Sequence, residues 1–372
     1  MTKQWSIIPF FIPHQGCPHA CVFCNQRKIS GQELKPTGVE VASRIREYLR
    51  TIPSNRRVEV AFYGGSFTGV SPELQEELLW PAFQAYQQGW IDGIRVSTRP
   101  DLIDQLVVRR LINRGVKTIE LGVQSLDPEV LQASRRGHGV NEVAQAVEII
   151  REAGLNLGLQ MMIGLPRDNR ERALATGQAL TKLGPDFVRI YPTVVIRDTY
   201  LHKMLQHGDY RPLTVTEAVD WATSLYLQFA KHKIPVIRIG LQPTENLLTA
   251  GDLVAGPFHP AFGELVEAAA AQKQLTTLLN MWADSERLEF KPINRPPISC
   301  PPKLTLFLNP RYWSRIVGQK RSNLIYLERN WQISLKLQSD DRLPLRDLRL
   351  KSEPAKPEYY LSWEGFLTNC RI

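Results

Sequence analysis

The first 240 residues alternate short β-type runs with amphipathic stretches, and this alternation constrains the fold more than any other feature. The β-type runs lie at 6–13, 58–65, 93–100, 118–125, 157–166 and 187–195. Apolar residues recur at three- and four-residue steps, as amphipathic helices require, over 38–52, 71–86, 101–115, 143–154 and 170–184. This order is typical of parallel strands joined by crossover helices. The sequence therefore predicts an α/β fold, a partial (β/α)6 barrel of the TIM type with a smaller α+β domain after it.

Polar or glycine residues follow the predicted strands at the ends where barrels of this type place their catalytic groups. Gly64 and Gly65 follow the second run, and a glycine pair lets backbone approach a ligand closely. The other residues at these ends are Ser66, Ser97, Glu120, Gln124 and Gly164. Core packing does not explain one polar group per strand end. We therefore expect a ligand site at this end of the barrel.

Three cysteines, Cys17, Cys21 and Cys24, follow the first run with the spacing C-x3-C-x2-C. A 4Fe-4S cluster normally takes four cysteine ligands, so three leave one iron open to a ligand that is not protein. A structural zinc site is the main alternative, since His14 or His19 could complete a Cys3His tetrahedron.

Two other readings of the cysteines are disfavoured. Disulfide frameworks belong to small oxidised domains, whereas this chain has 372 residues and no secretory signal. Cys300 and Cys370 are too few to hold a second cluster. The loop cysteines therefore remain the candidate metal ligands.

The composition is that of an ordinary water-soluble protein with an excess of positive charge. It is 43% hydrophobic and 22% charged, and no apolar run is long enough to cross a membrane. We expect a cytoplasmic protein. The net charge of +9 favours a polyanionic partner such as RNA, although charge alone is a weak signal.

The run from His14 through Thr199 resembles the radical S-adenosylmethionine (SAM) superfamily, and within it most resembles the catalytic subunit of Elongator. The shared motifs are GGSFTG, STRPD, ELGVQS, RRGH, GLP and RIYPTVVIRDT. The resemblance implies a 4Fe-4S cluster on the three cysteines, SAM on the open iron, a 5'-deoxyadenosyl radical and a flavodoxin- or ferredoxin-type electron donor.

The resemblance also implies roles for residues that bind SAM. Phe23 should pack near the adenine, and the backbone of Gly64 and Gly65 should meet the amino group. Oxygen-independent coproporphyrinogen oxidases share the GVQ strand and an arginine twelve residues later, which makes Gln124 and Arg136 candidates for the ribose and the carboxylate. The full cofactor-binding set is Phe23, Gly64, Gly65, Ser66, Ser97, Glu120, Gln124, Arg136 and Gln160.

Each of the last assignments has a structural alternative. Gln124 could cap a strand end, Arg136 could be a surface charge, and Gln160, which stands where those oxidases place a ribose-binding acid, could be a buried amide. Two further residues, Tyr191 and Arg197, are predicted to contact the substrate, and Tyr191 could equally be a packing residue.

The chain departs from the Elongator pattern after residue 240. It has no glycine-rich pyrophosphate loop like that of an acetyltransferase, so acetyl-CoA is not expected as co-substrate. Ser66 and Ser97 also replace glutamates common in the superfamily. We expect three segments: a core barrel over 1–240, a helical extension with a proline-rich linker over 241–300, and a small basic α+β domain over 301–372.

Residues 303–339 read as strand, helix, turn, helix and strand, and resemble the core of a KH domain, which clamps single-stranded RNA at a GXXG loop. Gly318 matches the first glycine and Arg321 replaces the second. Residues 311–351 hold ten Lys or Arg against four Asp or Glu. Four rings, Tyr312, Trp313, Tyr326 and Trp331, either stack on bases or fill the core of the domain.

These observations favour a radical SAM enzyme that modifies an RNA base, with tRNA as the expected class. Two alternatives stay open: a radical SAM enzyme for a small molecule such as a tetrapyrrole, and a non-catalytic metal-bound RNA-binding protein.

Overall fold

The protein is described by a computed structural model that covers residues 5–12, 16–25, 28, 36–242, 251–285, 303–352 and 358–370. Contacts divide the chain into two compact units. The first unit combines residues 1–218 with 234–260, and the second combines residues 219–233 with 261–372.

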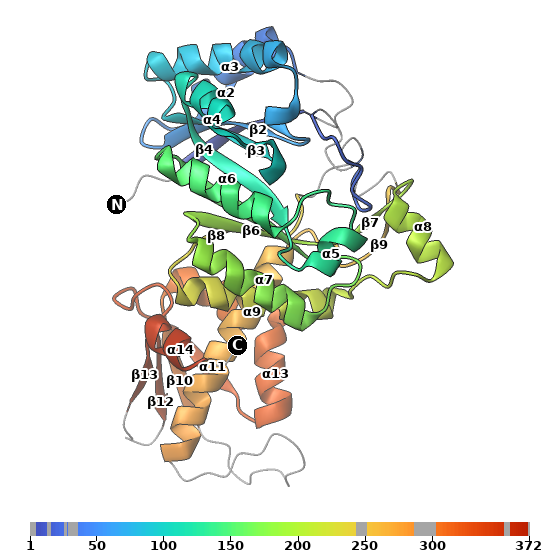
Figure 1. Ribbon diagram of the computed structural model, residues 1–372. Helices are drawn as coiled ribbons and strands as arrows, with labels where there is room; N and C mark the ends of the chain where they lie inside the picture. The colour runs from blue at the N-terminus through green and yellow to red at the C-terminus, as the bar shows by residue number, and fades with distance from the viewer. Residues whose placement is uncertain are drawn as a thin grey trace. The chain divides into compact units, whose positions relative to one another are not determined.

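A sheet of seven parallel strands forms the centre of the first unit (Figure 1). In spatial order the strands are β1 (Trp5–Phe11), β2 (Arg57–Tyr63), β3 (Gly93–Thr98), β4 (Val116–Gln124), β5 (Asn156–Ile163), β6 (Phe187–Pro192) and β8 (Val236–Ile239). The expected α/β partial barrel is confirmed, and β8 adds a seventh strand beside the six that the sequence predicts.

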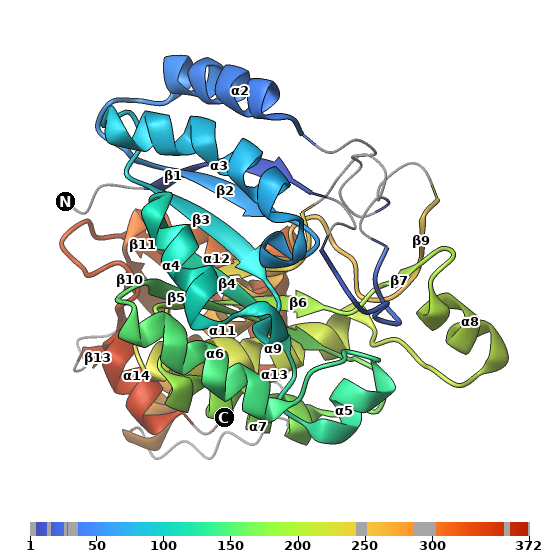
Figure 2. The same cartoon turned by 45° about the horizontal axis from the view of Figure 1, so that its top comes forward.

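Helices alternate with these strands and lie along one side of the sheet (Figure 2). They are α2 (Gly38–Thr51), α3 (Pro72–Gln87), α4 (Gln105–Asn113), α6 (Val140–Glu152) and α7 (Arg170–Leu183). The shorter elements of this unit are the 3-10 turns η1 (Phe67–Gly69) and η2 (Pro100–Leu102), the helices α5 (Pro128–Ala133) and α8 (Tyr200–His207), and the strand pair β7 (Val195–Ile196) and β9 (Leu253–Ala255).

Local sequence signals set where the helices start. Thr37, Ser71, Asp104 and Asn169 each stand just before a helix and accept a backbone N–H from its first turn. Thr37 and Glu40 form a full capping box at the start of α2. Because each helix begins at a defined residue, the loop before it leaves the strand end at a defined place.

The second unit is built on a four-stranded sheet with the order β11-β10-β12-β13. Its elements are α9 (Val215–Lys231, most of it in this unit), α11 (Phe262–Ser285), β10 (Leu304–Leu308), η3 (Pro310–Tyr312), α12 (Trp313–Val317), η4 (Gln319–Arg321), α13 (Ser322–Trp331), β11 (Leu335–Ser339), β12 (Leu348–Ser352), β13 (Tyr359–Leu361) and α14 (Trp363–Asn369). Strand β10 pairs parallel with β11 and antiparallel with β12. The smaller α+β region that the sequence predicts is therefore present.

Two of the four rings for which the sequence left stacking on bases or core packing open belong to the core of this unit. Tyr312 is 5% exposed and its hydroxyl donates to Gln274 Oε1, and Trp331 is 8% exposed. Tyr326 is 36% exposed.

Across the described residues, none of the helices combines the length and the apolar character needed to cross a membrane.

Candidate functional site

The cysteine loop follows β1 and is fastened to three separate segments. Val22 donates its backbone N–H to Ser134 O at 3.1 Å, and its own carbonyl accepts from Leu201 N at 2.8 Å. Gly16 lies so close to Gly69, at the end of η1, that a side chain on either glycine would overlap the backbone of the other segment. These contacts hold residues 16–24 at the carboxyl ends of the strands.

Two of the three thiols contact polar residues of other loops, one after β2 and one after α5. Cys17 Sγ lies 3.3 Å from Ser66 Oγ, just after β2. Cys21 Sγ accepts from Arg136 Nη1 at 3.3 Å. Cys24 closes the turn by donating its N–H to Cys21 O at 3.1 Å. The loop is thus joined to the residues that the sequence predicted around a cofactor.

Arg136 is held from every side rather than exposed as a surface charge. It is 6% exposed, its Nε donates to His138 Nε2 at 3.0 Å, and its Nη2 donates to Gly122 O. Arg99, which is 1% exposed, binds Asp101 and donates to Arg136 O at 2.6 Å. Burial and the neighbouring Arg136 charge lower the pKa of His138 to about 4, so its neutral ring accepts a hydrogen bond from the guanidinium.

A charge network fills the interior of the partial barrel below the strand ends. Glu120 is fully buried and accepts from Arg95 Nη1 at 2.7 Å, Arg189 Nη2 at 2.9 Å and Gln160 Nε2 at 2.9 Å. Glu59 binds Arg95 from the other side. Two arginines and two glutamates balance in charge, which a buried network of this size requires.

Two tyrosines and a serine complete this network. Arg189 donates to Tyr63 at 2.9 Å and lies 3.5 Å from the Tyr191 hydroxyl, and Gln160 Nε2 reaches Ser97 Oγ at 3.4 Å. Burial raises the pKa of Tyr63 to about 12, and burial also raises the pKa of Tyr191. Both phenols therefore stay protonated at neutral pH.

Gln124 is a strand-end residue with an open polar atom, and Thr193, directly after β6, is another. Its Oε1 is buried and, within the described part of the chain, accepts no hydrogen bond. Its backbone φ is +69°, a left-handed value that is uncommon for a residue with a side chain. A buried acceptor without a donor is costly, and a strained backbone is found most often at functional sites.

Glycines at the strand ends adopt conformations that other residues rarely take. Gly64 and Gly65 have φ of +77° and +58°, and Gly164 has φ of +74°. Tyr210 donates its hydroxyl to Gly164 O at 2.6 Å, which fixes the end of β5. The pair at 64 and 65 therefore turns the chain sharply just before Ser66.

The remaining predicted residues lie in different places. Phe23 packs on a buried apolar cluster of Val22, Val195, Leu201 and Tyr210, beside the cysteines. Tyr191 joins the interior network. Arg197, by contrast, stands just after β7, and its side chain donates to Gly251 O at 2.8 and 3.1 Å rather than to a member of that network.

Sequence reasoning missed Glu59, Arg95 and Arg189. Their signal is a single charge inside an otherwise apolar strand run, as in VEVAF, GIRVS and FVRIY. A charge in a strand that is buried on both faces needs a partner, so three such charges together indicate a network.

The donor set suits an iron–sulfur cluster. Within the ranges that the structure describes, no three His, Cys, Asp or Glu side chains gather closely enough to hold one metal ion. A cuboidal cluster, however, is bound through separate irons, so its thiolates stand farther apart than the ligands of one ion. Cys17, Cys21 and Cys24 are free thiols on one loop, and two of them contact Ser66 and Arg136. Of the zinc alternatives, the His19 ring packs on Gly137, and His14 lies outside the described residues.

Comparison with known families identifies the class. Residues 11–180 match the radical SAM superfamily, and residues 185–272 match the radical SAM C-terminal domain. This chain is a radical SAM protein, and thus an enzyme of a class that uses SAM.

Its relatives include tRNA-modifying enzymes and Elongator subunits. It is 27% identical to the tRNA uridine(34) acetyltransferase of Dehalococcoides mccartyi over 53% of this chain and 50% of that protein. It is 28% identical to Elongator complex protein 3 of Saccharomyces cerevisiae over 56% of this chain and 45% of that protein. The chain therefore spans about half the length of these relatives.

A solved structure of archaeal Elp3 from Methanocaldococcus infernus, with an N-terminal deletion, shares the fold. The TM-score is 0.55 at 20% identity, covering 78% of this chain and 65% of that one.

Proposed function

We propose that Cys17, Cys21 and Cys24 ligate a 4Fe-4S cluster with one open iron, and that the chain binds SAM there and modifies a base of RNA, most simply of tRNA. The observation that carries this proposal is the fastening of the cysteine loop to the strand ends through Ser66 and Arg136. A cluster held there would lie at the catalytic end of the barrel.

The side chains at this end match the chemistry of SAM. When bound, the cluster and SAM together supply a one-electron cleavage of the sulfonium that yields a carbon radical. Gln124 Oε1 is placed to accept from a ribose hydroxyl, and the Arg136 guanidinium, held by Arg99 and His138, offers positive charge to a carboxylate.

The other predicted residues contribute in different ways. Phe23 would cover the adenine from its apolar cluster, while Gly64 and Gly65 leave room for the amino group. Ser66 would lie next to the cluster, because its hydroxyl contacts Cys17 Sγ. The remaining members, Ser97, Glu120 and Gln160, are bonded to one another and would set the floor of the site, with Tyr191 below a bound substrate.

The substrate class rests on the relatives and on charge. The names of two related enzymes specify tRNA uridine, and the chain carries a net charge of +9. Acetyl transfer is not part of the proposal, because residues after 240 contain no matching pyrophosphate loop. Flavodoxin or ferredoxin in the cytoplasm would deliver the electron. Arg197 remains a proposed contact with the substrate. Residues 301–372 remain a proposed separate domain that resembles a KH domain.

Anaerobic reconstitution with iron and sulfide tests this function. After dithionite reduction, the protein should form 5'-deoxyadenosine from SAM, and Cys17→Ala, Cys21→Ala and Cys24→Ala should each abolish it. Cys370→Ala and Cys300→Ala are the matched controls and should retain it. Equal loss in a control would show that the cluster is misassigned.

The RNA step needs its own readout. Bulk tRNA incubated with the active enzyme, digested and analysed by mass spectrometry should contain a nucleoside of altered mass that the Cys17→Ala enzyme does not form. Deoxyadenosine formation with unaltered tRNA would keep the radical chemistry and refute the RNA substrate.

A further inference from the structure

The small sheet of the second unit has two unlike faces. Alternate residues of its strands are buried and apolar, and they include Leu304, Leu306, Leu308, Leu348 and Leu350. The residues between them point to the opposite face, because side chains alternate along a strand. That opposite face, which we call the open face, carries Lys336, Thr305, Lys351, Gln338, Phe307, Arg349 and Tyr360.

Strand register arranges the open face in two rows. Lys336, Thr305 and Lys351 stand opposite one another and form the first row. Both lysines are exposed and neither forms an ion pair with another described residue. Thr305 between them is only 9% exposed, so this row offers the positive charge of the two lysines.

The second row is aromatic. Phe307 stands opposite Gln338 on one side and Arg349 on the other, and Arg349 stands opposite Tyr360. Tyr360 is 50% exposed and Phe307 is partly exposed. Since neighbouring strands are about 4.8 Å apart, the rings on β10 and β13 are separated by about 10 Å.

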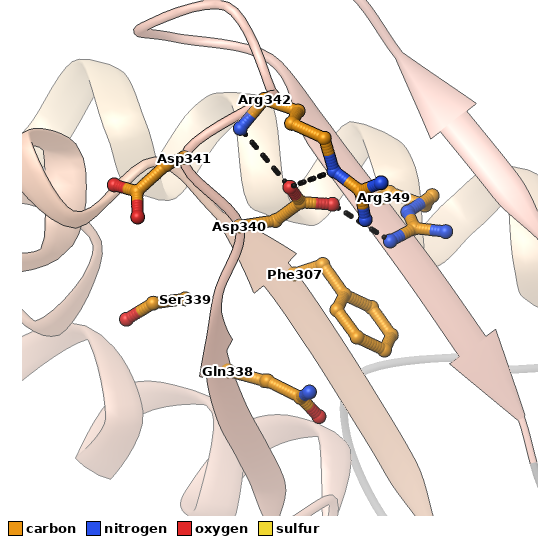
Figure 3. Close-up of a pocket in the computed structure, with 7 residues that line it drawn as sticks. All are labelled: Phe307, Gln338, Ser339, Asp340, Asp341, Arg342 and Arg349. Atoms are coloured by element: carbon orange, nitrogen blue, oxygen red, sulfur yellow. Dashed lines mark hydrogen bonds and ion pairs between the residues drawn. The ribbon is translucent and has the colours of Figure 1, made fainter.

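Phe307 lines a hollow of about 360 Å³ together with Gln338, Ser339, Asp340, Asp341, Arg342 and Arg349 (Figure 3). The Arg349 guanidinium lies 4.4 Å from the centre of its ring and is held by Asp340 at 3.0 Å and Glu358 at 2.9 Å. Figure 3 shows Gln338 reaching along the same side as the ring. Ring and guanidinium thus form a fixed flat surface, and a fixed surface loses little entropy on binding.

We propose that the open face binds single-stranded RNA, with Phe307 and Tyr360 stacking on separated bases and Lys336 and Lys351 contacting phosphates. Splayed bases on the aromatic residues of a sheet are a recurring solution for single-stranded RNA. A merely solvated face would not need an aromatic ring in its centre with a braced guanidinium above it.

The open face lies apart in sequence from the helix turn at which the chain resembles a KH domain. Lys320 and Arg321, between α12 and α13, have φ of +50° and +62°, and Arg321 lies 3.8 Å from Glu328. Two of the rings near that turn, Tyr312 and Trp331, are buried. Tyr326 is exposed and Trp313 is partly exposed on those helices, whereas Phe307 and Tyr360 lie together in one row of the open face.

Fluorescence anisotropy with the full chain tests the open face. The probe is a labelled 12-nucleotide oligouridine, compared with an A-form RNA duplex and with polyglutamate. Phe307→Leu should weaken binding of the single strand by about 5- to 150-fold, the range that stacking of one base gives. Lys336→Gln with Lys351→Gln should lower the slope of log affinity against log salt by about 1.4.

The matched control is Lys320→Gln with Arg321→Gln, which removes the same charge from the turn. It should change the affinity by less than twofold. If Phe307→Leu proves unstable by thermal unfolding, the variant that combines Lys336→Gln with Lys351→Gln tests the open face. Wild-type affinity in both open-face variants, loss confined to the turn variant, or equal binding of duplex or polyglutamate would each overturn the proposal.

This inference takes only the RNA substrate class from the proposed function, and the two fail separately. Altered tRNA nucleosides with unchanged binding by the open-face variants would remove the open face alone. Binding through the open face without any altered nucleoside would remove the proposed reaction alone.

Discussion

Gly69→Ala should displace the cysteine loop while leaving the barrel folded. A Cβ on Gly69 would overlap the carbonyl oxygen of Gly16 and lie 2.8 Å from both Gly16 C and Leu102 Cδ1. Backbone cannot move aside there without shifting the loop that carries Cys17. Overpacking of this kind costs about 1–3 kcal/mol, which corresponds to a fall in Tm of about 2–12 °C for a unit of this size.

The sharper effect should be on iron. Displacing the loop moves its thiols away from Ser66 and Arg136, so reconstituted iron binding should weaken by about 10-fold, as for other residues that support metal ligands. Iron and sulfide per chain and differential scanning calorimetry measure the two effects. Gly139→Ala is the control, because its Cβ would meet only the side-chain Glu142 Oε2, at 3.2 Å. Equal iron content and equal Tm in the two variants would refute this reasoning.

Two other substitutions test buried charge. Glu59→Gln removes one of the two carboxylates bound to Arg95 and should lower the free energy of unfolding in urea by about 3 kcal/mol. Glu76 belongs to an exposed ion pair, so Glu76→Gln should lower the free energy of unfolding by less than about 1 kcal/mol. Equal losses in the two variants would show that the buried network adds no stability. Burial raises the pKa of Asp168 to about 7, so the folded chain holds this proton and loses stability as pH rises from about 4 to 7. In Asp168→Asn this part of the slope should vanish, so the Tm of the variant relative to the wild type should rise over that window; a constant difference would contradict the shift.

The sequence predicts the first unit well because parallel strands that are buried on both faces leave a strong pattern. The run at 93–100 contains β3, which is buried throughout, and a helix follows it as expected. The pattern does not show which charges meet, because that depends on register. Arg95 donates to Glu120 because β3 and β4 pair in the register that places Ser97 opposite Glu120.

The second unit was harder to predict because its parts are not continuous in sequence. Residues 219–233, in the α9 region, belong with residues 261–372, so no local signal marks where the unit begins. The order of strands and helices after residue 303 could be predicted from periodicity. Which rings lie inside could not be predicted, since Tyr312, for example, is buried and donates its hydroxyl to Gln274, a residue distant in sequence.

The polar residues at the strand ends fall into two groups, and the difference indicates where a ligand would bind. Glu120 and Gln160 direct their hydrogen bonds to one another and to arginines, so they give the barrel a rigid floor. Gln124 has a buried acceptor that no described residue satisfies, and Arg136 holds the cysteine loop beside it. A ligand gains most where it satisfies an unpaired group, because that cost is already present in the folded chain. The Gln124 end of β4, rather than the network below it, is therefore the place at which we propose that a polar ligand binds.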